Sequence, residues 1–229
     1  MHSRNPLVFL ALLALVILPL RLAQAEDKAA ALQKVLRQLD TAANGFHTTT
    51  ATVEFDSIQT DPIYDKDVMT GTAFYERNSH LEMAVHFANH IVDGKSHPTG
   101  KAYVFSGGML RVSDTGKEID AKPVEQASKY ESYFVLGFGA GGKDLEEKWT
   151  IKYLGKETLD GIAVDVLELV AKDPTVRKNI AKVTVWMDTA RAVSLKVIFD
   201  EGEGQSYICH YSNIKVNQPL PKTAFNFDK

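Results

Sequence analysis

The fold is constrained most by a two-residue alternation of apolar side chains, which starts near residue 48 and recurs almost to the end of the chain. The segment HLEMAVHFANHI shows the alternation clearly. Its apolar residues, which share one face of an extended chain, are Leu81, Met83, Val85 and Phe87. Short turns separate such segments, and the pair Asp160-Gly161 is typical of a tight hairpin turn. Successive hairpins predict an antiparallel sheet of about ten strands.

Two segments depart from this alternation and predict helices, residues 27–43 and 123–136. The first has four apolar residues at helical spacing, Leu32, Val35, Leu36 and Leu39, and the pair Asn44-Gly45 is a typical helix end. Strands and helices do not alternate regularly along the chain, so a parallel sheet is not expected. The sequence therefore predicts an α+β protein.

The first 25 residues predict a secretory signal peptide. A weakly basic start leads into an apolar run from Leu7 to Leu20, and Ala23-Gln24-Ala25 forms a small-x-small cleavage signal. The run is shorter than the about 20 apolar residues of a membrane span. We expect cleavage after residue 25 and a single mature domain over residues 26–229. Since Cys209 is the only cysteine and lies far from the cleavage site, we expect a soluble periplasmic protein without a lipid anchor.

Charge and cysteine content exclude several classes of function. The chain has 26 basic and 29 acidic residues, and removal of residues 1–25, which hold two arginines, leaves a net charge of −5. An acidic chain without a basic run gives no support to nucleic-acid binding. A single cysteine allows neither an intramolecular disulfide nor a cysteine-based zinc cluster.

The stretch GFGAGGKD fits two nucleotide-binding patterns. Gly137, Gly139 and Gly142 match G-x-G-x-x-G, and Gly137 to Lys143 match most of a P-loop. The first pattern requires a preceding strand, whereas the residues before these glycines look helical. The second requires Ser or Thr after the lysine, where this chain has Asp144, whose carboxylate repels phosphate. We therefore expect no nucleotide binding and interpret the glycines as a flexible hinge.

Two other groups of residues suggest a metal site and a catalytic thiol, but the geometry of a strand argues against both. His86 and His90, with His97 nearby, suggest metal ligands, but residues four apart on a strand are separated by about 13 Å. Cys209 and His210 are adjacent on a strand and point to opposite faces, so they do not form a nucleophile–base pair. No hydrolase or metalloprotease motif appears, and we expect neither an enzyme nor a cofactor or metal.

The sequence from Leu136 to Asp228 resembles the LolA-like periplasmic carriers of outer-membrane lipoproteins. The segments that support the resemblance are FVLGFGAGGKDLEEKWTIKYLGKETLDGIAVDVLELVAKDP, KVTVWMD and YSNIKVNQPLPKTAFNFD. Towards the amino terminus, the signal peptide, the amphipathic helix, Phe46 and GTAFYER follow in the order of that family. The resemblance thus covers nearly all of the mature chain.

The resemblance implies an incomplete, strongly curved antiparallel barrel with helices covering its concave face. It also implies a carrier that takes acylated lipoproteins from an inner-membrane ABC transporter to an outer-membrane acceptor. By the same resemblance Arg77 corresponds to the family's arginine, which reaches the helical lid and keeps the empty form closed. That arginine is usually followed by proline, whereas this chain has Asn78.

We expect the acyl chains to lie in an apolar cavity. The expected lining and lid residues, with Arg77 as a polar latch, are Met83, Val85, Phe87, Leu136, Phe138 and Trp186. A packed core with nothing inside remains the simpler alternative. Two further hypotheses are a periplasmic lipid- or lipoprotein-sensing regulatory domain and a carrier of another amphiphile such as a glycolipid. We expect the protein to be a monomer.

Overall fold

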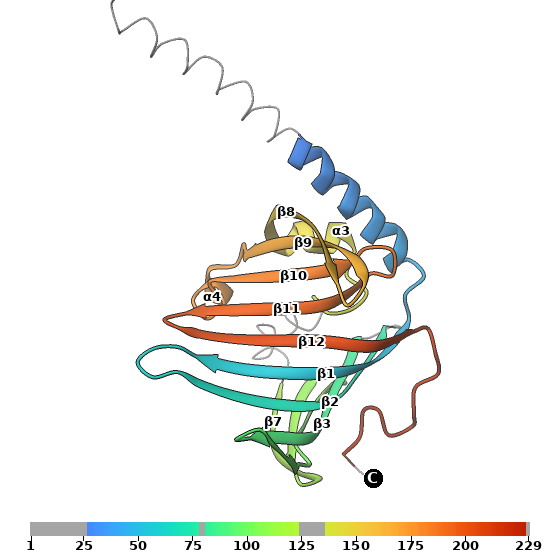
Figure 1. Cartoon of the computed structure of the whole chain (residues 1–229). Helices are drawn as coiled ribbons and strands as arrows, with labels where there is room; N and C mark the ends of the chain where they lie inside the picture. Colours follow the sequence, from blue (N-terminus) through green and yellow to red (C-terminus); the bar gives the residue numbers. More distant parts are fainter. Residues whose placement is uncertain (1–26, 78–80, 124–135, 228–229) are drawn as a thin grey trace, which may run out of the picture.

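The computed structural model describes residues 27–77, 81–123 and 136–227 of the 229-residue chain. Its main element is a single antiparallel sheet of 12 strands, which curls around its concave face (Figure 1). The strands are β1 (Thr48–Gln59), β2 (Asp65–Arg77), β3 (Leu81–Val92), β4 (Lys95–Pro98), β5 (Ala102–Ser106), β6 (Met109–Asp114), β7 (Lys117–Pro123), β8 (Trp149–Leu159), β9 (Ile162–Ala171), β10 (Lys182–Asp188), β11 (Val193–Gly202) and β12 (Gln205–Val216). The expected incomplete barrel is confirmed, with more strands than the about ten that the alternation predicted.

The order of the strands in the sheet explains why the barrel has an opening. Neighbouring strands follow the order β7-β6-β5-β3-β2-β1-β12-β11-β10-β9-β8, and β4 pairs with β3. The first and last strands of the chain, β1 and β12, therefore pair in the middle, while β7 and β8 form the two edges. Because β7 and β8 are consecutive along the chain, the segment between them connects one edge of the sheet to the other.

The helices agree only in part with the sequence prediction. Residues 27–43 form a helix as predicted, and Val35, Leu36 and Leu39 are its most buried residues. The predicted helix over 123–136 lies mostly outside the described residues, and its first residue, Pro123, ends β7. Two short helices were not predicted, α3 (Gly142–Lys148) and α4 (Pro174–Arg177). Within the described ranges, none of the helices has the length and apolarity needed to span a bilayer.

Candidate functional site

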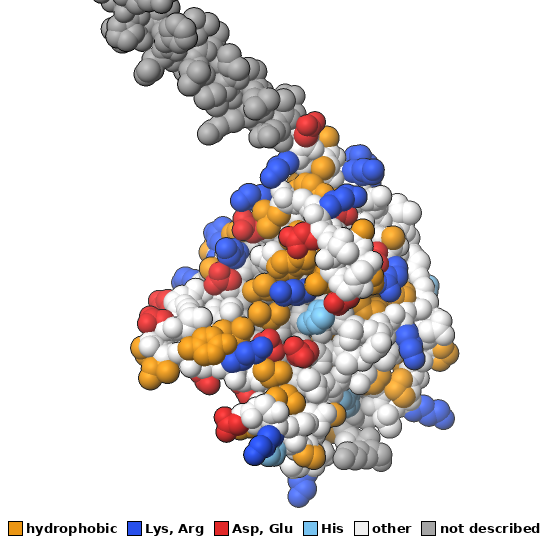
Figure 2. All heavy atoms as spheres, viewed as in Figure 1, with side chains coloured by type: hydrophobic (Ala, Val, Ile, Leu, Met, Phe, Trp, Pro, Cys, Tyr) orange, Lys and Arg blue, Asp and Glu red, His pale blue; other side chains and the backbone are white. Residues whose placement is uncertain are grey.

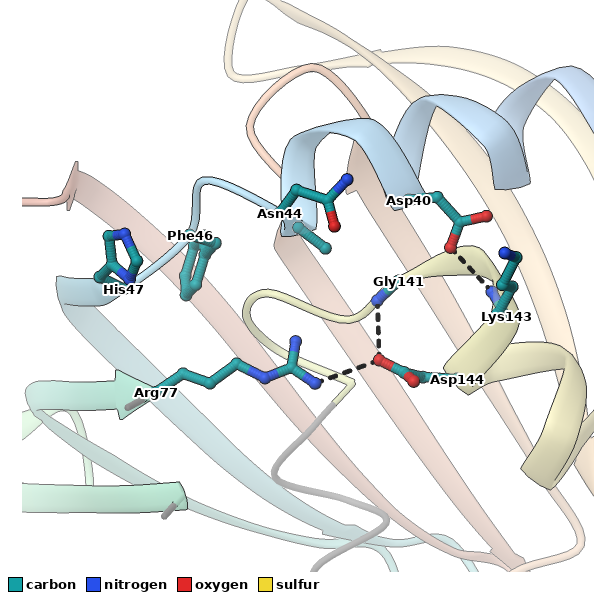
Figure 3. Close-up of a pocket in the computed structure, with 9 residues that line it drawn as sticks. Asp40, Asn44, Phe46, His47, Arg77, Gly141, Lys143 and Asp144 are labelled. Carbon is teal, nitrogen blue, oxygen red and sulfur yellow. Dashed lines mark hydrogen bonds and ion pairs between the residues drawn. The ribbon is translucent and has the colours of Figure 1, made fainter. Parts of the chain in front are cut away.

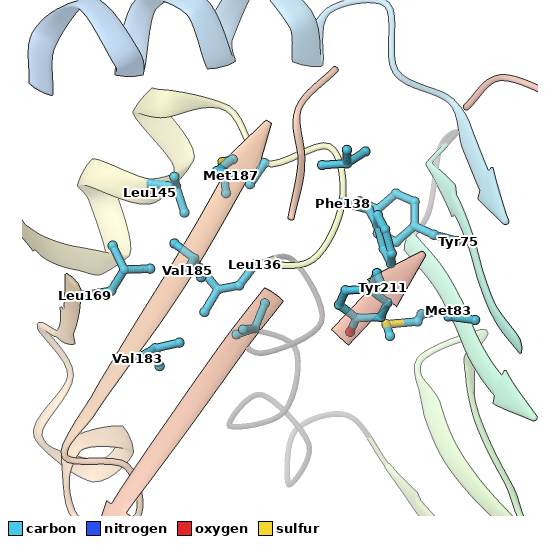
Figure 4. Packing of buried hydrophobic residues seen from close by; sticks show 14 of the residues in the cluster. Tyr75, Met83, Leu136, Phe138, Leu145, Leu169, Val183, Val185, Met187 and Tyr211 are labelled. Carbon is cyan, nitrogen blue, oxygen red and sulfur yellow. The ribbon is translucent and has the colours of Figure 1, made fainter. Parts of the chain in front are cut away.

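The concave face of the sheet is lined by a continuous apolar cluster (Figure 4). Met83 and Phe87 on β3 are 5% and 6% exposed, and Val85 between them is partly buried against the same cluster. Leu136 and Phe138, which belong to the segment that connects the two sheet edges, are each 1% exposed. The structure thus brings five of the predicted lining residues into one cluster.

A row of aromatic side chains leads from the end of the N-terminal helix into this cluster. The ring of Phe46 lies 5.5 Å from that of Tyr75, measured between centroids, and Tyr75 lies 6.0 Å from Phe138. Phe138 in turn meets Tyr211 on β12 edge to face at 4.9 Å. Burial raises the pKa of Tyr75 to about 12, so its phenol stays neutral over the physiological range.

The glycine-rich loop is a packed part of this region in the described structure, and the interpretation of its glycines as a flexible hinge stays a prediction. All residues from 136 to 142 are buried. The loop pairs with β11 and with the turn before it. The Gly139 amide donates to the Ala192 carbonyl at 2.7 Å, and the Ser194 amide donates to the Gly137 carbonyl at 2.8 Å. The Ser194 hydroxyl also donates to the Leu136 carbonyl at 2.7 Å. The loop is therefore anchored to the sheet.

Close packing explains two of the glycines. A Cβ on Gly139, whose φ is +69°, would lie 2.5 Å from the Phe46 ring. A Cβ on Gly142 would lie 2.3 Å from the carbonyl oxygen of Leu36 in the N-terminal helix. Both distances are far below van der Waals contact, so any larger residue would separate the loop from its neighbours. The resemblance to a nucleotide-binding pattern thus arises from packing requirements.

Arg77, at the end of β2, links the sheet to this loop. Its guanidinium donates to the Gly139 carbonyl at 2.6 Å and to the Asp144 carboxylate at 3.1 Å. The side chains of Arg77 and Asp144 are 37% and 45% exposed. The backbone amide of Arg77 also donates to the carbonyl of His47 at 2.7 Å. Arg77 therefore bridges β2, the loop and α3 at a partly solvated position.

A polar pocket of ≈ 560 Å³ opens beside this bridge (Figure 3). Its lining residues come from the end of the N-terminal helix, the following loop, β2 and the start of α3: Asp40, Ala43, Asn44, Phe46, His47, Arg77, Gly141, Lys143 and Asp144. The Asp40 carboxylate accepts a hydrogen bond from the Lys143 amide at 3.0 Å. The pocket balances two basic against two acidic side chains, so it suits polar groups better than acyl chains.

Sequence reasoning missed Asp144 as the partner of Arg77. The sequence did contain a signal for a helix start at this point. An acidic residue often lies three positions after the residue that caps a helix, as Asp144 does after Gly141. No helix was predicted for the run GKDLEEK, because a helix of seven residues leaves too short a pattern to recognise.

The prediction that Trp186 lies near the cavity is wrong. Val185 and Met187, its neighbours on β10, are buried in the apolar cluster, and Trp186 points to the other face of the sheet. There its indole donates to Glu157 at 2.7 Å, and the Lys196 ammonium lies 4.9 Å from its ring centroid.

His86 and His90 have hydrogen-bond partners, and burial makes the thiol of Cys209 less reactive. The His86 ring lies 2.8 Å from the Ala224 carbonyl, and the His90 ring bonds to the Asp67 carboxylate. Burial raises the pKa of the Cys209 thiol to about 11, which keeps it protonated and unreactive near neutral pH.

Comparison with known proteins bears on the fold. No family model and no curated protein matches the sequence. Among solved structures, the chain is similar to lipoprotein LppX of Mycobacterium tuberculosis, with a TM-score of 0.51, 16% identity and coverage of 84% of this chain and 98% of LppX. A LolA superfamily protein of Nitrosomonas europaea matches with a TM-score of 0.39, 16% identity and coverage of 85% and 96%. The MucA/MucB complex of Pseudomonas aeruginosa matches with a TM-score of 0.46, 12% identity and coverage of 86% and 60%. At 16% identity, the similarity to LppX shows the fold alone, and this agrees with the incomplete antiparallel barrel that the family resemblance implied.

Proposed function

We propose that this half-barrel binds acyl chains against its concave face and carries acylated lipoproteins or lipids across the periplasm. In this proposal an inner-membrane ABC transporter supplies the cargo and an outer-membrane acceptor receives it. The observation that supports it best is the apolar cluster on the concave face, in which Leu136 and Phe138 come from a connecting segment and not from the sheet. Such a segment can move away from a sheet more easily than one strand can leave another.

The proposed acyl site lies between this segment and strand β3. Met83, Val85 and Phe87 would form its wall on the sheet, and Leu136 and Phe138 would cover it. Each buried CH₂ group of the cargo contributes about 0.8 kcal/mol, so cargo with several acyl chains would bind too tightly for release unless binding also broke existing contacts. Displacement of Leu136 and Phe138 from the cluster would offset part of that gain and keep transfer reversible.

Arg77 would set the balance between the closed and open forms. Its bonds to Gly139 and Asp144 exist only while the loop lies against β2, so they stabilise the closed form alone. Both partners are partly exposed, which limits the strength of the ion pair. A latch of modest strength suits a protein that has to open in every cycle.

Transfer of a fluorescent acylated lipoprotein from donor to acceptor membranes tests the proposal. Phe87→Glu would place an unpaired carboxylate beside the acyl chains, so transfer should stop. Ala88→Glu is the matched control, because Ala88 is the next residue on β3 and is exposed. Circular dichroism has to show that both variants fold. Equal transfer by two folded variants would refute the proposed site.

A further inference from the structure

The turn between β1 and β2 presents two large apolar side chains to solvent. Ile63 is 76% exposed and Tyr64 is 66% exposed, and they are the two most exposed large hydrophobic residues in the described part of the chain. They follow each other directly, so they form one continuous apolar tip. Neighbouring exposed apolar residues of this size commonly mark an interaction site.

This tip is held in place by the adjacent turn between β11 and β12. The amide and the hydroxyl of Thr60 both donate to the Gly204 carbonyl, at 2.9 and 3.2 Å. The Gln59 side chain donates to the Asp61 carbonyl at 3.0 Å. The two turns also pack closely, since a Cβ on Gly204 would lie 2.8 Å from the Thr60 hydroxyl oxygen. Ile63 and Tyr64 are therefore presented outward by an ordered turn, which lowers the entropic cost of binding.

Acidic side chains surround the tip. Asp61 and Asp65 flank the apolar pair, Glu203 lies on the β11–β12 turn, and Glu201 lies near the end of β11, and all four are exposed. The nearby Lys66 ammonium is already paired with Asp56 at 2.8 Å. Figure 2 shows hydrophobic and acidic side chains together at the end of the sheet where Figure 1 places these turns. This charge opposes contact with an anionic membrane surface and with a second acidic tip.

We propose that the tip of residues 60–65 is a docking site for a protein that presents an apolar socket with a basic rim. Ile63 and Tyr64 would fill the socket, and the four acidic side chains would face the rim. The tip lies at the far end of the β1–β2 hairpin from Arg77, because β1 has 12 residues and the Arg77 amide bonds to His47, just before the strand begins. A strand of that length spans roughly 40 Å. A partner bound at the tip would leave the polar pocket and the loop beside Arg77 free, so the inference does not depend on the acyl cargo.

Photo-crosslinking in the native cells tests this docking site. Tyr64→p-benzoylphenylalanine in the full chain should give an adduct with one protein, and the adduct should map to a lysine- or arginine-rich surface. The double change Asp65→Lys and Glu203→Lys should lower its yield at least about tenfold, because like charges then face each other. Ile119→p-benzoylphenylalanine is the matched control, since Ile119 on β7 is 65% exposed and should give no such adduct.

Several outcomes would overturn the proposal. These are the absence of an adduct, an adduct with lipid or with a second copy of the chain, and a protein adduct whose yield survives the charge reversal. Thermal unfolding of the variants has to match that of the unmodified protein, which is expected because all four substituted side chains are exposed. If charge reversal nevertheless unfolds the protein, Ile63→Ser is combined with Tyr64→p-benzoylphenylalanine. This change removes an apolar contact with the partner and should also lower the adduct yield. An unchanged yield in that variant would also overturn the proposal.

Discussion

Replacement of Arg77 by methionine is the perturbation that tests the latch most clearly. The change keeps an apolar stem but removes the bonds to the Gly139 carbonyl at 2.6 Å and to Asp144 at 3.1 Å. The ion pair contributes about 0–1 kcal/mol, because both side chains are more than one third exposed. A hydrogen bond from a charged donor contributes about 1.5–3 kcal/mol, and partial solvation favours the lower value. The free energy of unfolding should therefore fall by about 2 kcal/mol.

Two assays measure this effect. For a domain of roughly 200 residues, a loss of 2 kcal/mol lowers the Tm by roughly 4–8 °C in thermal unfolding. If the same bonds hold the loop closed, the open fraction rises about 30-fold, and a fluorescent fatty-acyl probe should enter correspondingly faster. Arg37→Met is the matched control, because Arg37 is exposed on the N-terminal helix. That change should shift the Tm by no more than about 2 °C.

Two results would refute this reasoning. One is an Arg77→Met protein with the Tm and the uptake rate of the control variant. The other is an Asp144→Asn protein that loses as much stability as Arg77→Met, since the loss would then come from the contacts of Asp144, which also accepts from the Gly141 amide, and the carbonyl bond of Arg77 would not be needed to explain it.

Further predictions concern packing, reactivity and orientation. Gly142→Ala should lower the free energy of unfolding by roughly 1–3 kcal/mol in a denaturant titration, because its Cβ meets the Leu36 carbonyl at 2.3 Å. Gly45→Ala, with nothing within 4 Å of its Cβ, should leave that free energy nearly unchanged, and equal losses would contradict the packing account. Iodoacetamide should label Cys209 slowly at pH 8, since a pKa of about 11 leaves about 0.1% thiolate. The labelling rate should rise about tenfold per pH unit, and a plateau near pH 9 would contradict the raised pKa. Trp186→Phe should leave acyl binding unchanged, because the indole faces away from the cluster, and a loss of binding would place it back in the site.

The strands could be predicted from the sequence because alternation and turn residues act locally. The alternating residues from Leu81 to Phe87 lie within β3, and the Asp160-Gly161 turn joins β8 to β9 as expected. Strand β4 was missed because its four residues are all exposed and show no alternation. The curvature of the sheet and its opening depend on pairings between distant strands, such as β1 with β12, and came only from the family resemblance.

The site was harder to predict because it depends on which segments meet. The position of Trp186 was predictable in principle, since Val183, Val185 and Met187 already occupy the inner face of β10 and leave the outer one for the tryptophan. The role of Gly142 could not be predicted, because the Leu36 carbonyl that crowds it lies more than 100 residues earlier in the chain. A glycine that permits motion and a glycine that permits contact look the same in the sequence.

Localised crosslinking of a bound acyl chain tests the central claim most directly. A lipoprotein whose acyl chain carries a terminal diazirine is loaded onto the protein and irradiated, and the modified peptides are identified by mass spectrometry. The account predicts adducts on Met83, Val85 or Phe87 and on Leu136 or Phe138, all of which lie in or against the apolar cluster. Adducts confined to the outer face around Trp186, or no adduct above that of an unloaded control, would contradict it.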